Sequence, residues 1–343
     1  MKKLIGIQDP LFTWALHPNH LYQYGLEIEL TPEELLLGTG LTLECLEDID
    51  LHISWAQYRD LALNVQKKVG LGWGLQFGSR LSIGSHGLVS LLALNCTYWH
   101  QILELLTDYP VLVSPIFYTS TKKTDNHTYL NVRPEFTRHP VLNCSLEAFF
   151  AIIYKSINDL GGEALTHGNE DWTVYFRSEP PPHKDKLIEF FNGKVEWGYY
   201  ADQVKFPSSF LPRKIANGNP VAAESTRRIM KSQLNMLPAT HGGLNELRKL
   251  FEKGIYKQEE CAAEMFTTLA TLKRFLKNAS TSFSNELTLY RIEEACWAAR
   301  YTDKSAAQLA DELGFQDVNS LGRLFKKEVG MPFSSYCERH RTV

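Results

Sequence analysis

Basic and small polar side chains recur at helical spacing near the C-terminal end of the chain. Between residues 317 and 329 one arc of a predicted helix carries Asn319, Ser320, Arg323, Lys326 and Lys327. A guanidinium can bind O6 and N7 of one guanine, amide and hydroxyl groups can bind neighbouring base edges, and ammonium groups can bind phosphates. The chemistry that this arc predicts is recognition of double-stranded DNA.

Two short helices are needed to present that arc. Ser305 can cap a first helix that runs to Leu313, and Gly314 ends it. A second helix should begin near Asp317 and end at Gly330, with an apolar stripe on its inner side. That stripe consists of Val318, Leu321, Phe325 and Val329. Two helices joined by a turn of three or four residues have the geometry of a helix-turn-helix. An ordinary amphipathic hairpin with a solvated basic face is the alternative for this motif alone.

The same pattern occurs a second time, at residues 261–277, and this weakens the alternative. Leu269, Leu272 and Leu276 form its apolar stripe. The candidate DNA contacts of the first copy are Ala270, Thr271, Lys273, Arg274 and Lys277, and Val318 joins those of the second. Residues 283–301 between the copies are predicted to form one rigid helix, which suits two recognition helices in successive major grooves about 34 Å apart.

These residues resemble the tandem helix-turn-helix domain of the AraC/XylS family of bacterial transcription regulators. The family pattern is met over residues 240–343 by Ala310, Gly314, Phe315, Asn319, Leu321, Arg323, Phe325, Lys326, Gly330 and Tyr336. Two positions depart from it. Gly322 lies inside the second recognition helix, and Phe266 replaces the turn glycine in the first copy. The resemblance implies a DNA-binding transcription regulator, with RNA polymerase as a further partner if it activates.

The first 200 residues have the pattern of an α+β domain. Helices are expected at about 31–37, 52–69, 85–107, 145–160 and 183–191, and strands within 116–123, 128–136, 172–178 and 194–200. Residues 72–106 and 181–211 resemble the larger ligand-sensing domain of one branch of the family, which includes regulators of ornithine and other amino-acid catabolism. The region is too helical for a jelly roll. The resemblance implies a domain that binds a small organic effector or pairs with a second copy.

The net charge of the chain changes sign near residue 225, close to the point where strand-like segments end. Residues 1–224 have a net charge of −7 and residues 225–343 a net charge of +4, so a polyanion should meet the C-terminal part. Asn217 to Pro220 marks a break. We therefore expect an effector-binding or dimerisation domain at 1–215, a linker at 216–239 and an all-α DNA-binding domain at 240–343. No apolar run approaches the roughly 18 residues of a membrane helix, and the scattered cysteines favour the cytoplasm.

A pocket in the N-terminal domain should be mostly apolar and aromatic. Its candidate lining residues are Trp73, Phe77, Trp99, Tyr118 and Tyr175. Each of them is also compatible with ordinary core packing.

The sequence gives little support to the hypothesis that this protein is an enzyme. The glycines at 70, 72, 74 and 78 lack the spacing of a phosphate loop. His86 and His241 have no nucleophile elbow nearby, and His17 with His20 provides only two metal ligands. We expect no metal, cofactor or catalytic residue. Two alternatives stay open: an N-terminal domain that only forms a homodimer, and a bifunctional DNA repair enzyme, against which the lack of a metal-spaced cysteine cluster argues.

Overall fold

The structure, a computed structural model, describes residues 6–167, 171–236 and 242–341. These residues divide into two compact units, an N-terminal unit that runs to residue 236 and a C-terminal unit that begins at Gly242. His241, considered above as a candidate site residue, lies outside the described residues.

Two sheets lie within the described part of the N-terminal unit. The smaller sheet pairs β1 (Pro10–Thr13) with β2 (His52–Ser54) in antiparallel fashion. The larger sheet has five strands in the order β3-β4-β7-β5-β6, and only its β5–β6 pair is parallel. Its strands are β3 (Phe117–Lys123), β4 (His127–Pro134), β5 (Thr173–Tyr175), β6 (Val195–Glu196) and β7 (Gln203–Pro207).

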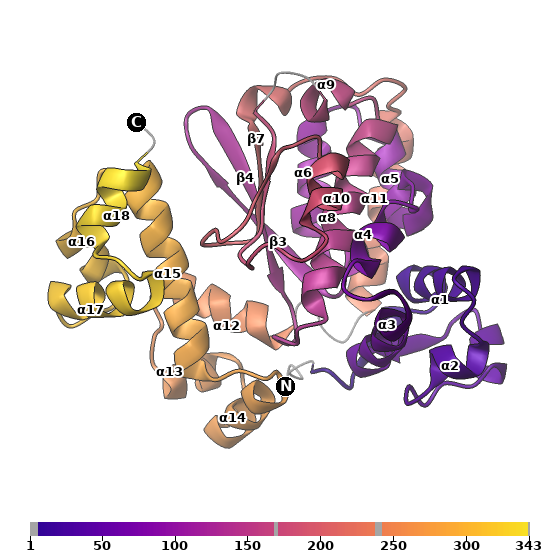
Figure 1. Cartoon of the computed structure of the whole chain (residues 1–343), viewed down its shortest axis with the longest axis horizontal. Helices are drawn as coiled ribbons and strands as arrows, with labels where there is room; N and C mark the ends of the chain where they lie inside the picture. Colours follow the sequence, from indigo (N-terminus) through magenta and orange to yellow (C-terminus); the bar gives the residue numbers. More distant parts are fainter. Residues whose placement is uncertain (1–5, 168–170, 237–241, 342–343) are drawn as a thin grey trace. The chain divides into compact units, whose positions relative to one another are not determined.

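Helices make up most of the remainder of this unit, and Figure 1 shows α5, α6, α8 and α11 on one side of the larger sheet. The α-helices are α1 (His17–Glu27), α2 (Pro32–Leu36), α3 (Trp55–Val69), α4 (Trp73–Gly78), α5 (Leu88–Asn95), α6 (Trp99–Asp108), α7 (Pro110–Val113), α8 (Leu142–Asp159), α9 (Glu163–Thr166), α10 (Lys184–Phe190) and α11 (Pro220–Met236). Three 3-10 turns are η1 (Glu44–Glu47), η2 (Ile83–His86) and η3 (Ser208–Phe210). This mixed sheet with covering helices differs from a jelly roll, and the predicted α+β class is confirmed.

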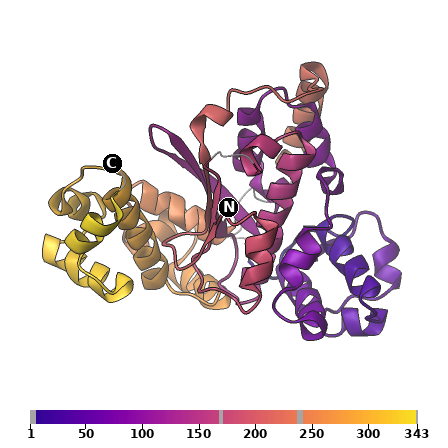
Figure 2. The same ribbon diagram turned by 45° about the horizontal axis from the view of Figure 1, so that its top comes forward.

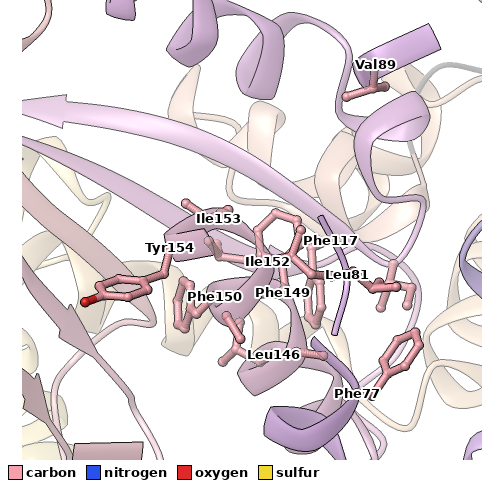
Figure 3. Close-up of a cluster of buried hydrophobic side chains, with 14 of the residues drawn as sticks. Phe77, Leu81, Val89, Phe117, Leu146, Phe149, Phe150, Ile152, Ile153 and Tyr154 are labelled. Carbon is pink, nitrogen blue, oxygen red and sulfur yellow. The ribbon is translucent and has the colours of Figure 1, made fainter. Parts of the chain in front are cut away.

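Helix α8 lies at the centre of the core. Figure 3 shows its apolar side chains beside Phe117 of β3, whose ring centre is 5.4 Å from that of Phe149. Helix α4 approaches α8 so closely that a β-carbon at Gly74 would lie 1.8 Å from the carbonyl oxygen of Cys144. A β-carbon at Gly78 would likewise lie 2.6 Å from the carbonyl oxygen of Ala148, so these two glycines of α4 serve helix packing, which requires residues without side chains at the contact.

The predicted elements are largely present, with three corrections. The expected helix at 85–107 is divided into η2, α5 and α6, with extended backbone at Cys96 and Tyr98 between the last two. Residues 52–54 pair with β1 as β2, and the side chain of Ser54 then caps α3, which starts at Trp55. Most of the segment expected as a linker forms α11, whose Ala223, Thr226 and Met230 are buried; α11 packs on α5. The N-terminal unit thus extends past residue 215 and includes α11.

The C-terminal unit is helical throughout its described residues. Its helices are α12 (Gly243–Glu252), α13 (Gln258–Glu264), α14 (Leu269–Asn278), α15 (Phe283–Tyr301), α16 (Ala306–Glu312), α17 (Val318–Val329) and α18 (Phe333–His340). In Figures 1 and 2, α15 is the long central helix, with α12 to α14 towards one end and α16 to α18 towards the other. A helix of 19 residues is about 28 Å long. Buried Arg248 of α12 forms an ion pair of 2.9 Å with buried Glu293 of α15, which ties the first half of the unit to this helix.

Candidate nucleic-acid interface and effector cavity

The second helix-turn-helix motif consists of α16 and α17, and its local signals are those expected from the sequence. The Ser305 hydroxyl caps α16 in a reciprocal capping box with Gln308. Gly314 has a φ of +66°, in the left-handed region, and turns the chain. The Asp317 carboxylate accepts a hydrogen bond of 2.6 Å from the backbone N–H of Ser320 and caps α17. Gly330 ends α17 in the left-handed conformation.

Helix α15 holds the turn of this motif in place. The Arg291 guanidinium donates to the carbonyl oxygens of Leu313, at 2.9 Å, and Gly314, at 2.8 Å. It also lies 4.2 Å from the ring centre of Phe315. The Tyr256 hydroxyl donates to the carbonyl oxygen of Glu312 at 2.7 Å. Burial lowers the pKa of Arg291, which nevertheless remains charged at neutral pH because an arginine pKa is normally above 12. No local pattern in the sequence indicates this role for Arg291.

The first motif, α13 and α14, repeats the arrangement with a different turn. Thr268 caps α14 by accepting a hydrogen bond of 3.1 Å from the backbone N–H of Thr271. Leu272 and Leu276 are buried as predicted, and Phe275 is buried beside them. Phe266, which replaces the turn glycine, has a φ of +52° and a side chain that is 65% exposed. This residue therefore adopts a conformation that suits glycine and gains little burial in return.

The outer faces of α14 and α17 are accessible. The exposed members of the predicted contact set are Ala270, Lys273, Arg274, Lys277, Val318, Asn319, Arg323, Lys326 and Lys327, and Thr271 and Ser320 are partly exposed. Val318 was also expected in the apolar stripe, but it is 42% exposed because it occupies the first turn of α17, whereas Leu321 and Phe325 are buried. The Arg323 guanidinium donates to the Ser320 hydroxyl at 3.0 Å, which places both groups together on the outer face.

Three neighbouring cavities lie in the N-terminal unit. The outer cavity, of about 240 Å³, is lined by Leu11, Phe12, Thr13, Ala15, Leu16, His17, Pro18, His52, His86, Gly87, Leu88, Val89, Val111, Leu112, Val113, Pro115 and Gln233. The inner cavity, of about 90 Å³, is lined by His17, Ile83, His86, Val89, Ala93, Ile102, Leu105, Leu106, Val113, Phe149, Ile152, Ile153, Ser156, Ile157 and Leu160. The deep cavity, of about 40 Å³, is lined by Trp99, Ile102, Leu103, Leu106, Leu130, Ile153, Ile157, Leu165, Trp172, Val204, Phe206, Phe210 and Leu211.

Shared lining residues connect the three cavities in a row. The outer and inner cavities share His17, His86, Val89 and Val113. The inner and deep cavities share Ile102, Leu106, Ile153 and Ile157. Figure 3 shows Val89 of α5 and the side chains of Phe149, Ile152 and Ile153 on α8, which line the inner cavity. An apolar interior with a few polar groups near its entrance is the usual construction of a small-molecule site.

Two histidines stand where the outer and inner cavities meet. His17 begins α1 and His86 ends η2, and the distance between His17 Nε2 and His86 Nδ1 is 2.9 Å. Burial, followed by the neighbouring histidine, lowers the pKa of His17 to about 3, and burial lowers the pKa of His86 to about 4. Both rings are therefore neutral at pH 7, since an exposed histidine titrates near 6.5.

A larger hollow of about 460 Å³ lies between α2 and α3 and is lined by Leu37, Gly38, Asp60, Leu63, Asn64, Gln66 and Lys67. Two of its polar side chains, Asn64 and Lys67, already have hydrogen-bond partners in the fold. The Asn64 amide donates to the carbonyl oxygens of Leu35 and Leu37, and Lys67 donates to the Asn64 side-chain oxygen. We therefore regard the row of three cavities as the better candidate site.

Comparison with known proteins identifies the class of both units. Residues 30–215 match the family described as the arabinose-binding domain of AraC transcription regulators, and residues 261–339 match a helix-turn-helix domain family. The chain belongs to the AraC family of transcription regulators. It is a DNA-binding regulator, as its resemblance to that family predicted. The word arabinose belongs to the description of the family, whereas the cavities of this regulator are lined mainly by apolar side chains.

Individual relatives are also transcription regulators. The ornithine utilization regulator of Pseudomonas aeruginosa is 24% identical over 299 residues, which cover 86% of this chain and 87% of that protein. The crystal structure of the transcriptional regulator CdpR from Pseudomonas aeruginosa aligns over 97% of this chain and all of its own, with 16% identity and a TM-score of 0.48. A DNA-binding transcriptional dual regulator of Escherichia coli K-12 aligns over 28% of this chain and 89% of its own, with 23% identity and a TM-score of 0.27.

The predicted pocket residues of this regulator fall in different places. Trp99 lines the deep cavity. Trp73 and Phe77 pack together on α4, with ring centres 6.2 Å apart, and are buried in the core. Tyr118 and Tyr175 follow the core residues Phe117 and Val174 along their strands, so strand alternation turns them towards the opposite face of the sheet. Of the five, Trp99 alone is among the residues that line the outer, inner or deep cavity.

The sequence did not predict that His17 and His86 meet. His86 was considered as a hydrolase residue and His17 as a metal ligand, each by itself, because 69 positions separate them and no local pattern joins them. Within the described ranges, no group of three histidine, cysteine, aspartate or glutamate side chains is placed to hold a metal ion. Across the same ranges, the helices are too short or too polar to cross a membrane.

Proposed function

We propose that this protein is a cytoplasmic one-component regulator in which a small effector, bound in the N-terminal unit, changes how the C-terminal unit binds its operator. The observation that carries the proposal is the pairing of two exposed basic recognition helices with a separate acidic unit that contains connected apolar cavities. The acidic unit gains nothing from phosphates, so its part in DNA binding must be indirect.

In this proposal, α14 and α17 enter successive major grooves. Arg274 and Arg323 bind base edges, Asn319, Ser320 and Thr271 bind beside them, and Lys277, Lys326 and Lys327 bind phosphates. Ala270, Lys273 and Val318 complete the contact surface. The exposure of these side chains and the fixed turn of the second motif support the assignment. RNA polymerase is a further partner if the protein activates transcription.

A homodimer is part of the proposal. Helices α5 and α11 pack on each other, yet Leu91 and Leu94 of α5 and Val221 and Ile229 of α11 expose between 45% and 79% of their surface. Exposed apolar residues on two adjacent helices support pairing with a second copy. Sedimentation of the full chain, with Leu91→Glu as a comparison, measures this pairing directly.

The chemistry of three buried cysteines gives no support to a DNA repair enzyme that uses them as nucleophiles. Burial raises the pKa of Cys96 and of Cys261 to about 11, and that of Cys144 to about 12. A thiol with such a pKa is protonated at neutral pH and is a poor nucleophile. The relative that matches most of this chain, the ornithine utilization regulator, is a regulator and not an enzyme.

The test of the DNA contacts uses single arginine variants of the full chain. Arg274→Ala and Arg323→Ala should each weaken binding to a duplex selected from a random pool by about 1 to 3 kcal/mol. Arg228→Ala is the matched control, because Arg228 is an exposed arginine of α11 in the N-terminal unit. Unchanged affinity in both recognition-helix variants, with the melting temperature preserved, would remove these arginines from the interface.

A further inference from the structure

The entrance to the inner cavity contains a polar atom that lacks a partner. His86 is only 7% exposed, and its Nε2 has no hydrogen-bond partner among the described residues. The other ring nitrogen, Nδ1, lies 2.9 Å from His17 Nε2, and the backbone N–H of His86 donates to the Ser90 hydroxyl. A buried ring nitrogen is normally hydrogen-bonded, because leaving it unpaired costs its desolvation. The His86 ring lines both the outer and the inner cavity, so a bound molecule at their junction can supply the missing partner.

The charge of the cavities limits the kind of molecule. Neither the outer nor the inner cavity has a lysine, arginine, aspartate or glutamate among its lining residues. A carboxylate would find no fixed positive charge there, and an ammonium group would find no carboxylate. Burial of an unpaired charge in such surroundings is strongly unfavourable. A neutral hydroxyl or carbonyl oxygen avoids that cost. A hydroxyl can hydrogen-bond to Nε2 of a neutral imidazole in either tautomer, because it can both donate and accept. A carbonyl oxygen can do so only in the tautomer whose Nε2 carries the proton.

The inner cavity determines the rest of the molecule. Beyond the histidines its lining is aliphatic and aromatic, from Val89 and Ala93 of α5, Leu105 of α6, and Phe149 and Ile152 of α8, with Ser156 as a further polar residue. A volume of about 90 Å³ accepts a short hydrocarbon chain. The four side chains that the inner and deep cavities share separate the inner cavity from the deep cavity, which adds about 40 Å³ of apolar space.

We propose that the effector is an uncharged aliphatic molecule with one terminal hydroxyl or carbonyl oxygen, bound with that oxygen at His86 Nε2 and with its hydrocarbon chain in the inner cavity. This inference rests on the proposed function, because it names the ligand class of the effector site. His17 is a positioning residue that holds the His86 ring through the contact between their nitrogens. The low pKa values of both rings support an uncharged binding partner.

The test compares three head groups on one six-carbon chain. Binding of 1-hexanol, hexanoate and hexylamine to the full chain is measured by calorimetry at pH 7. We expect 1-hexanol to bind at least tenfold more tightly than either charged molecule. Affinity should also rise about fourfold for each methylene from 1-butanol upward until the cavity is filled, which is the ordinary gain from burying such a group. Equal or tighter binding of hexanoate or hexylamine would overturn the proposal.

Three variants locate the site. Ala93→Leu fills the inner cavity and should abolish binding of 1-hexanol, whereas Ile157→Ala enlarges it and should move the preferred alcohol to a longer chain. His86→Leu should lower the affinity for 1-hexanol by about tenfold, which corresponds to the loss of one hydrogen bond. His20→Gln is the matched control, because His20 bonds the backbone oxygen of Ser85 and lines neither cavity. Hexanol binding that is unchanged in folded Ala93→Leu, or an unshifted preference in Ile157→Ala, would contradict the assigned site.

Operator affinity separates this inference from the function on which it rests. If 1-hexanol binds as described but leaves operator affinity unchanged, the ligand class is supported and the proposed regulation fails. If a charged compound changes operator affinity equally in the unmodified protein and in Ala93→Leu, the proposed regulation stands and the ligand class is overturned.

Discussion

Gly314 in the turn of the second helix-turn-helix is the position where one added methyl group should have the largest effect. Its φ of +66° is unfavourable for alanine, at about 1 to 2 kcal/mol. A β-carbon there would also lie 2.2 Å from Cδ2 of the Tyr256 ring. Tyr256 would have to move and lose its hydrogen bond to Glu312, which contributes about 0.5 to 1.5 kcal/mol. We therefore expect Gly314→Ala to lower the free energy of unfolding of the C-terminal unit by about 2 to 3 kcal/mol.

Urea denaturation, followed by hydrogen exchange in peptides from residues 242–341, measures this loss without contributions from the other unit. Operator affinity should fall in parallel, because the turn sets the angle at which α17 is presented. If Gly314→Ala is as stable as the unmodified protein, then neither the backbone strain nor the Tyr256 contact is as described, and the account of this turn is wrong.

Three further changes have defined outcomes. Phe266→Gly should stabilise the C-terminal unit by about 0.5 to 1 kcal/mol in the same exchange assay, because it relieves a left-handed φ at an exposed position; destabilisation would show that the exposed ring contributes packing. Gly322→Ala should stabilise by up to about 1 kcal/mol, since no atom lies within 4 Å of the added β-carbon, and an unchanged melting temperature would argue against a regular helix there. The lowered pKa of His86 means that the unfolded chain takes up its proton first, so the stability that this residue contributes is present above pH 6.5 and is lost as pH falls towards 4. In His86→Gln the loss between pH 7 and pH 5 should be smaller by about 2 kcal/mol in urea titrations, and equal losses in both proteins would mean that His86 is not buried as a neutral ring.

Local signals explain why the DNA-binding half could be predicted from the sequence. Ser305, Asp317 and Gly330 act on backbone groups within four residues of themselves, so their spacing determines the helix ends directly. The apolar positions 321 and 325 are one helical turn apart and are both buried. Val318 was assigned to the same stripe because the helical period alone does not show that the first turn of α17 stays open to solvent.

Long-range contacts explain what the sequence could not give. His17 and His86 meet only because α1 and η2 pack together, and Arg291 reaches the turn of α16 and α17 from 22 positions away. Tyr118 and Tyr175 were candidates for the pocket because of their type, but the face they occupy depends on strand register. The segment 216–239 resembled a linker because most of its residues are polar. Ala223, Thr226 and Met230 nevertheless form one buried face of α11, and this helix packs on α5.

The most direct test of the central claim is the operator affinity of the full chain measured with and without a compound that binds the N-terminal unit and raises its melting temperature. The account predicts a change of at least tenfold in Kd, which corresponds to about 1.4 kcal/mol of preference for one arrangement of the protein. The change should disappear in Ala93→Leu. Equal affinities with and without every such compound would contradict the claim that this regulator senses a ligand.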